Sequence, residues 1–186
     1  MSLKKKPHQK NAPSFKLEDY AYQMTDGIDL FQIEGVSFHL VLTLLSEVGT
    51  DLSPFPTANH FVSWLCLCPN KKVTGGVVLS SKTQKNKSLL RQAFKQAAIA
   101  VAKNKESSLA IFYRRMAAFK GKGTAITATA RKLAIIIYNM IQKKQPYSPQ
   151  PMVEYQEKVR KLKIKQIQRT IAKFELKEDE FVTLFA

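Results

Sequence analysis

Apolar residues recur at helical spacing through the middle of this 186-residue chain, and this periodicity limits the possible folds more than any other feature. Leu90, Phe94, Ala97 and Val101 fall on one face of a helix. The segment "TAITATARKLAIIIYNMIQKK" is apolar enough to form the central helix of a core. Because such faces are buried by packing helix against helix, the sequence predicts a mainly α fold, a compact helical domain.

The remaining elements are shorter. We expect a first helix from Leu17, stopped by Gly27, and a helix capped by Thr57. The segment Val73 to Ser80, with β-branched residues and a Gly-Gly pair, is the one extended stretch, a short Gly/Ser/Thr loop. A further helix has an apolar face outlined by Leu109, Phe112, Met116 and Phe119.

Composition divides the chain into three parts. Residues 1–16, rich in Lys, Pro, Asn and Ser, are predicted to be a basic tail or the end of a linker. Residues 17–150 form the main domain. Residues 151–186 form a C-terminal basic amphipathic helix and tail, whose apolar side is traced by Tyr155, Val159, Leu162, Ile167, Ile171 and Phe174.

The positive charge is concentrated in one interval. The chain carries a net charge of +16, and between Asp51 and Glu154 its only acidic residue is Glu106. A surface so one-sided repels itself, which favours a polyanionic partner, with DNA as the leading candidate. A solvated basic surface without a ligand and an anionic membrane surface are the alternatives.

No apolar run is long enough to cross a membrane, and the N-terminal residues lack the apolar stretch of a secretory signal. We therefore expect a cytoplasmic protein, associated with the nucleoid when bound to DNA, and no membrane partner. Cys66 and Cys68, one residue apart, are interpreted as reduced core thiols. The three histidines have no metal-ligand spacing, so we expect no cofactor in this chain.

Residues 28–49 have the pattern of a helix-hairpin-helix-like element. Its hairpin is hinged at Gly35, and Ser37 stands where a second glycine is usual. In such a motif, backbone N–H groups at a helix start approach a DNA phosphate. A plain helical hairpin without a ligand fits the same residues.

The segment "VTGGVVLSSKT" combines two adjacent glycines with hydroxyl side chains. Glycines permit close approach of a substrate backbone, and a hydroxyl can act as a nucleophile. A β-turn with incidental Ser and Thr explains the same pattern, because these residues favour turns in any case.

Several motifs occur in an order that resembles a known family: "DLFQIEGV", "LLSEVGTDLSPFPTANHFVSWL", "LCPN", "TGGVVLSSKT", "FYRRM", "AITATARKLAIIIYNMI" and "QPYSP". Together they are similar to the C-terminal transposase domain of insertion-sequence transposases of the Piv/MooV type, the one-ten group. The resemblance runs from about Asp29 to Phe174.

The resemblance implies a chemistry. In that family a serine of the C-terminal domain becomes joined to the DNA strand, and an N-terminal RuvC-like domain binds magnesium through acidic residues. The family serine corresponds to Thr74, with Ser80 and Ser81 as less favoured nucleophiles. The resemblance also implies homo-oligomers and, in some members, a guide RNA from the element.

Three departures from the family pattern bear on activity. Thr74 is a more crowded alcohol than serine, Val77 stands where the family commonly has lysine, and Cys66 replaces the usual glycine. The resemblance further implies that this chain lacks the RuvC-like domain. We therefore expect the chain alone to bind nucleic acid without cutting it.

Two hypotheses follow. The chain is the strand-joining half of a transposase or DNA recombinase, or it is a non-catalytic nucleic-acid-binding module, a transposase remnant. Both predict the same nucleic-acid-binding residues: Lys71, Lys72, Gly75, Gly76, Lys82, Lys85, Lys87, Arg91, Lys95, Arg114, Arg115, Lys122 and Arg131.

Overall fold

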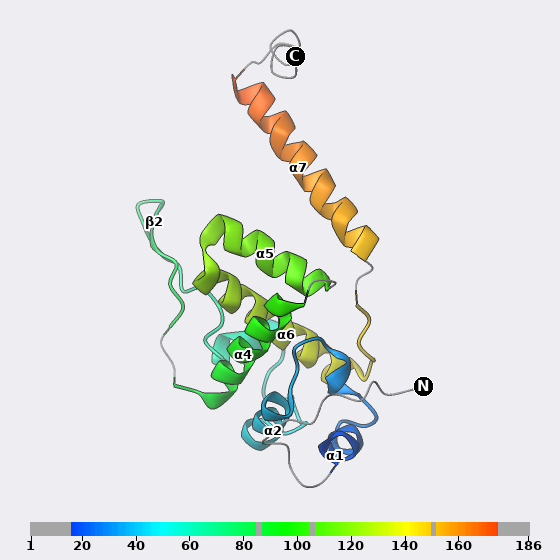
Figure 1. Ribbon diagram of the computed structural model, residues 1–186. Helices are drawn as coiled ribbons and strands as arrows, with labels where there is room; N and C mark the ends of the chain where they lie inside the picture. The colour runs from blue at the N-terminus through cyan, green and yellow to red at the C-terminus, as the bar shows by residue number, and fades with distance from the viewer. Residues whose placement is uncertain (1–15, 85–86, 105–106, 150–151, 175–186) are drawn as a thin grey trace. The chain divides into compact units, whose positions relative to one another are not determined.

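The computed structural model describes residues 16–84, 87–104, 107–149 and 152–174, and these are mainly α-helical, as the sequence predicts (Figure 1). The chain divides into two compact units, Met1–Ser148 and Pro149–Ala186, which are described separately. In order, the elements are α1 (Leu17–Met24), the 3-10 turn η1 (Leu30–Gln32), α2 (Phe38–Glu47), α3 (Ala58–Trp64), β1 (Lys72–Thr74), β2 (Val77–Ser80), α4 (Leu89–Lys103), α5 (Ser108–Lys120), α6 (Lys122–Lys143) and α7 (Met152–Phe174).

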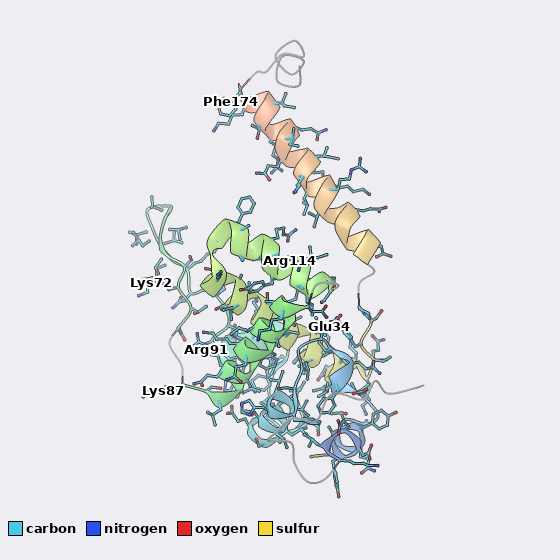
Figure 2. The ribbon with its side chains drawn as sticks, viewed as in Figure 1. Glu34, Lys72, Lys87, Arg91, Arg114 and Phe174 are labelled. Carbon is cyan, nitrogen blue, oxygen red and sulfur yellow. The ribbon has the colours of Figure 1, made fainter. Side chains whose placement is uncertain are left out.

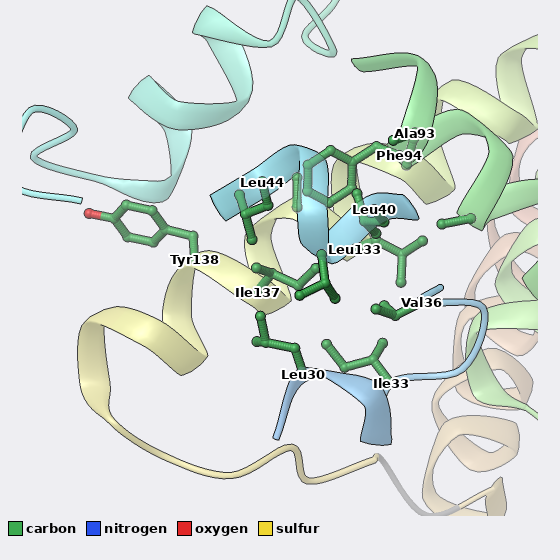
Figure 3. Close-up of a cluster of buried hydrophobic side chains, with 14 of the residues drawn as sticks. Leu30, Ile33, Val36, Leu40, Leu44, Ala93, Phe94, Leu133, Ile137 and Tyr138 are labelled. Carbon is green, nitrogen blue, oxygen red and sulfur yellow. The ribbon is translucent and has the colours of Figure 1, made fainter. Parts of the chain in front are cut away.

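Helix α6 is the centre of the first unit, and it contacts α3, α4 and α5. Its residues Leu133 and Ile137 are almost fully buried. Figure 3 shows them among side chains from η1, α2 and α4. Tyr138 has its ring in this core and donates its hydroxyl proton to the Phe55 carbonyl oxygen at 2.6 Å. The apolar segment predicted as the central helix therefore has that position.

Several helices have a serine or threonine side chain as their N-cap. The predicted cap Thr57 is confirmed, because its hydroxyl accepts from the backbone N–H of His60, the third residue after it. Ser88 caps α4 in the same way, accepting from Arg91, and Ser107 caps α5. The Glu47 carboxylate also accepts from the Leu90 N–H, which places a negative charge at the start of α4.

The extended segment is confirmed as a two-stranded antiparallel hairpin, β1 and β2, that projects from the helices (Figure 1). Gly75 and Gly76 form its turn with φ angles of 56° and 77°, a left-handed conformation that glycine adopts without a steric penalty. Both strands are largely exposed. The Gly-Gly pair thus has a sufficient structural role as a tight turn.

The helix-hairpin-helix detail is not confirmed. The residues of this segment before Gly35 form only the single turn η1, and Ile28, Leu30 and Ile33 are buried in the core. Gly35 itself is packed against α4, where an added Cβ would lie 2.6 Å from the Ala97 carbonyl oxygen.

Ser37 caps α2 with its side chain, accepting from the Leu40 N–H. Gly35 and Ser37 therefore have structural roles in joining this segment to the core.

The prediction of an apolar face along α5 is wrong for the last turn of the helix. Leu109 is buried as predicted, whereas Phe112 and Met116 are half-buried and Phe119 has 77% of its surface exposed. Helix α5 ends at Gly121, with φ 81°, directly after Lys120. The core side of α5 therefore does not extend to its last turn.

The second unit contains α7. Of its predicted apolar side, Val159 and Ile171 are half-buried, whereas Leu162, Ile167 and Phe174 are exposed. Tyr155 lies among the residues whose side chains are outside the described set.

Candidate nucleic-acid interface

A groove of about 700 Å³ lies between the base of the hairpin and the junction of α5 with α6. Its walls come from three stretches of the chain, around Pro69, around Ser81 and from Met116 to Arg131. The stem of the hairpin is held by an isolated bridge between Pro69 and Thr83 and by the Asn70 N–H, which donates to the Lys82 carbonyl oxygen at 3.1 Å. The groove is therefore formed by segments up to about sixty residues apart in sequence.

The lining is cationic and rich in hydroxyls. Its charged residues are Lys71, Lys82, Lys120 and Arg131, and the described lining contains no carboxylate. Its hydroxyl side chains are Ser81, Thr83, Thr124 and Thr127. Lysine and arginine supply positive charge, and hydroxyls can donate to an oxygen of a ligand, although the Thr127 hydroxyl already donates to the Gly123 carbonyl oxygen at 3.1 Å.

The beginning of α6 adds to the positive potential of the groove. Gly123 and Thr124, in the first turn of this 22-residue helix, line the groove. No side chain of the described residues caps that turn, and Gly121 precedes it with a left-handed φ. Exposed N–H groups at a helix start carry partial positive charge, which favours an anion nearby.

Arg131 reaches the groove from the third turn of α6. Its Nη2 donates to the Asn59 side-chain oxygen at 3.3 Å. Its Nε is buried and has no hydrogen-bond partner among the described residues. A buried donor of this kind is normally satisfied by an acceptor.

The hydroxyls proposed as nucleophiles lie in different places. Thr74 pairs with Val77 beside the exposed turn, and Val73 pairs with Val78. Because successive side chains of a strand point to opposite faces, Thr74 lies on the face opposite Val78, which lines the groove. Thr74 is exposed without being among the lining residues.

The two serines after the hairpin also differ. Ser81 lines the groove. Ser80 is half-buried, and its hydroxyl accepts from the Lys82 N–H at 3.3 Å. The groove therefore contains Ser81 rather than Thr74.

The predicted binding residues Lys87, Arg91 and Lys95, before and within α4, do not form one exposed surface. Arg91 is only 7% exposed, and its Nη2 donates to the Thr83 hydroxyl at 3.2 Å, so it supports the groove wall from within. Lys95 is half-buried, and burial, together with Arg91, lowers its pKa. Lys87 is exposed and lies two residues before α4 begins. Lys72 is exposed on the hairpin, as Figure 2 shows.

Other predicted cations belong to the faces of α5 and α6. Arg114 is exposed and Arg115 is half-buried. Arg115 and Lys132 lie 5.8 Å and 4.8 Å from the centre of the Phe112 ring. Burial lowers the pKa of Lys132, and Arg115 lowers it further. Lys122 is exposed at the start of α6, next to the groove, and Lys85 lies outside the described residues.

Several contributors to the groove could not be found from the sequence. Lys120, Thr124 and Thr127 flank the "KGKG" break between α5 and α6. That break indicates a helix end followed by a helix start. The sequence does not indicate that the break faces the base of the hairpin, because this contact depends on how α3, α4 and α5 surround α6.

The described residues hold no group of three or more His, Cys, Asp or Glu side chains that could bind a metal ion. Cys66 and Cys68 are free thiols, as expected, and half-buried rather than fully buried. No helix within the described ranges is long and apolar enough to cross a membrane.

The structure is thus a mainly α-helical domain with one groove lined by cations and hydroxyl side chains. Residues 29–114 match the model of the family described as "Transposase IS116/IS110/IS902 family". The family resemblance is thereby confirmed over residues 29–114, and the match supports a transposase-related role. No match was found among curated proteins or among solved structures.

Proposed function

We propose that this chain is the DNA-binding part of an insertion-sequence transposase, and that the groove holds the sugar-phosphate backbone. One observation carries the proposal: four cations and four hydroxyl side chains line one groove whose described walls contain no carboxylate. The match of residues 29–114 to a transposase family supports the same partner.

The proposal accounts for the charge of the chain. Lys71 and Lys82 belong to the hairpin base, and Lys120 belongs to α5. Bringing them around one groove costs electrostatic energy, because no described carboxylate lies between them. A bound backbone would neutralise these charges and release counterions, so affinity should fall steeply as salt rises.

The test compares cations inside and outside the groove. The double variant Lys71→Gln/Lys82→Gln should weaken binding to a duplex of mixed sequence. It should also reduce the slope of log affinity against log salt by up to about 2, the sum of two phosphate contacts. Fluorescence anisotropy at a series of salt concentrations measures both.

Its matched control is Lys103→Gln/Lys143→Gln, which removes the same charge from exposed lysines that do not line the groove. The control variant should change the slope by less than half as much. Equal effects of the two pairs would show diffuse attraction to the whole surface and would contradict the groove as the binding site.

A second candidate function is strand joining through a hydroxyl. Its support is the accessibility of Thr74, which is exposed beside the Gly75-Gly76 turn, together with the family resemblance. The threonine oxygen would form a bond to a backbone phosphorus while the bond from that phosphorus to a sugar oxygen breaks. The threonine proton would pass to a general base, and the sugar oxygen would take up a proton and leave as an alcohol. The metal-binding acids expected for this reaction belong to the family's RuvC-like domain.

Covalent attachment separates the two functions. With a RuvC-like domain and magnesium supplied, strand joining predicts a protein–DNA adduct in a denaturing gel. Thr74→Ala should abolish the adduct and Thr74→Ser should preserve it or increase its yield. Loss of the adduct in Ser81→Ala instead would assign the reaction to the groove hydroxyl. If no adduct forms while binding still depends on the groove lysines, the result would support the hypothesis of a non-catalytic nucleic-acid-binding module.

Binding of a guide RNA, homo-oligomeric assembly and association with the nucleoid stay predictions of the family resemblance. The groove fits the phosphates of DNA and of RNA alike, because the contacts that it offers are to backbone rather than to base edges.

A further inference from the structure

The side chain of Phe119 is the most exposed large apolar side chain among the described residues, with 77% of its surface accessible. The helical spacing places it with Leu109, Phe112 and Met116, yet α5 turns only its first part toward the core. A phenylalanine exposed to this extent loses the favourable burial of its ring. Its position relative to the groove suggests what the ring contacts instead.

Phe119 stands at the rim of the groove. It follows the lining residue Met116 by three positions and directly precedes the lining residue Lys120. At 100° per residue, the ring points about 60° from Met116 around the helix axis, to the side away from Lys120. The ring is therefore next to the cationic wall without being part of it.

On the helical side of the groove the described residues offer no apolar cluster to a protein partner, whereas the hairpin on the other side exposes Val73, Val77, Val78 and Leu79. On α5 and α6, Phe119 is the one large apolar side chain that is exposed among the described residues. In the sequence it is followed by the lining residue Lys120 and, two positions further on, by the exposed Lys122. A protein interface usually has a cluster of apolar and aromatic side chains at its centre, whereas a single ring on a helix, next to a lining lysine, is an arrangement that can stack a nucleic-acid base.

We infer that Phe119 stacks against an unpaired base of the strand whose phosphates occupy the groove, so that the preferred ligand is single-stranded or locally unpaired nucleic acid. In an intact duplex both faces of each base are covered by its neighbours, and the ring has no base to contact. The inference rests on the proposed function, since it assigns the kind of strand that the groove holds.

The experiment compares a single-stranded oligonucleotide with the duplex of the same sequence. Phe119→Ala should lower affinity for the single strand about tenfold, as loss of one stacked base does, and should leave duplex affinity within about twofold. The salt slope should not change, because no phosphate contact is removed. Leu89→Ala, which shortens another exposed apolar side chain away from the groove, is the matched control and should change neither affinity.

A second measurement reports the contact directly. Phe119→Trp in a Trp64→Phe background has one tryptophan, and its fluorescence should be quenched by the single strand and not by the duplex. The inference would be overturned if Phe119→Ala affected both ligands equally or neither, or if the tryptophan were not quenched. If Lys71→Gln/Lys82→Gln left binding unchanged, the groove proposal itself would be wrong, whatever Phe119 does.

Discussion

The backbone conformation of Cys66 explains why the related family commonly has glycine at this position. Its φ angle is 52°, in the left-handed region where a side chain is strained, and it directly follows Leu65, the C-cap of α3. The resemblance places a glycine at this position. The structure explains that preference, because the Cys66 N–H turns back to the Ser63 carbonyl oxygen and closes the end of the helix.

Replacing this cysteine should therefore alter stability in a predictable order. Cys66→Gly should have a free energy of unfolding about 1 kcal/mol higher than Cys66→Ala, because the two variants lack the thiol equally and only alanine has a strained Cβ. Thermal or urea unfolding followed by circular dichroism measures the difference. Cys66→Val should be the least stable of the three, and a ranking with alanine above glycine would contradict the backbone argument.

Arg91 and Phe119 show why residue type does not decide exposure. The arginine lies inside the protein and donates to Thr83, whereas the phenylalanine lies outside. The sequence analysis placed Arg91 among the residues that bind nucleic acid and Phe119 on the apolar face of its helix. Each residue lies at the edge of the apolar face of its helix. At such an edge, the neighbouring element determines whether a side chain is covered.

At the scale of elements, the hairpin and α7 contribute in different ways. The hairpin needs only Gly75 and Gly76 to turn and is exposed over most of its length, while its base carries the lysines of the groove. Helix α7 is described alone, and Lys161, Lys165, Arg169 and Lys173 recur along it at intervals of four residues. These four side chains are all exposed.

The spacing of these cations suits a phosphate backbone. Four residues advance the helix by about 6 Å and rotate it by only 40°, so the cations form one stripe. Ile164 and Ile167 lie on a different side of α7. If nucleic acid is the partner, Lys165→Gln/Arg169→Gln should reduce the salt slope of binding by about 2, as two lost phosphate contacts require.

The control for the stripe lies on the same helix. Arg160→Gln/Lys163→Gln removes two exposed charges from a different side of α7, and its slope should change by less than 1. Salt titrations of anisotropy compare the two variants. An equal change in both would mean that α7 attracts nucleic acid without an oriented face.

At the scale of the whole molecule, the charge and the core come from the same interval of sequence. The stretch between Asp51 and Glu154 supplies the +16 and also the helices α4, α5 and α6. Among the described residues, the ion pair at 2.7 Å joins Lys144 to Asp26 outside the groove. None of the groove's four cations takes part in that pair, and the apolar residues packed around α6 supply the core.

The sequence by itself determined the mainly α fold, the Thr57 cap, the extended segment and the transposase resemblance, because each depends on residues close together in the chain. The sequence also predicted a helix-hairpin-helix-like element, which the structure does not confirm. The segment with η1 is instead packed into the core around Ile33 and Gly35. Only the tertiary structure decided that Lys71, Lys82 and Lys120 share one groove and that Phe119 is exposed at its rim. Local periodicity fixes the faces of a helix, whereas the packing of several helices around α6 decides which faces meet and which are left to a partner.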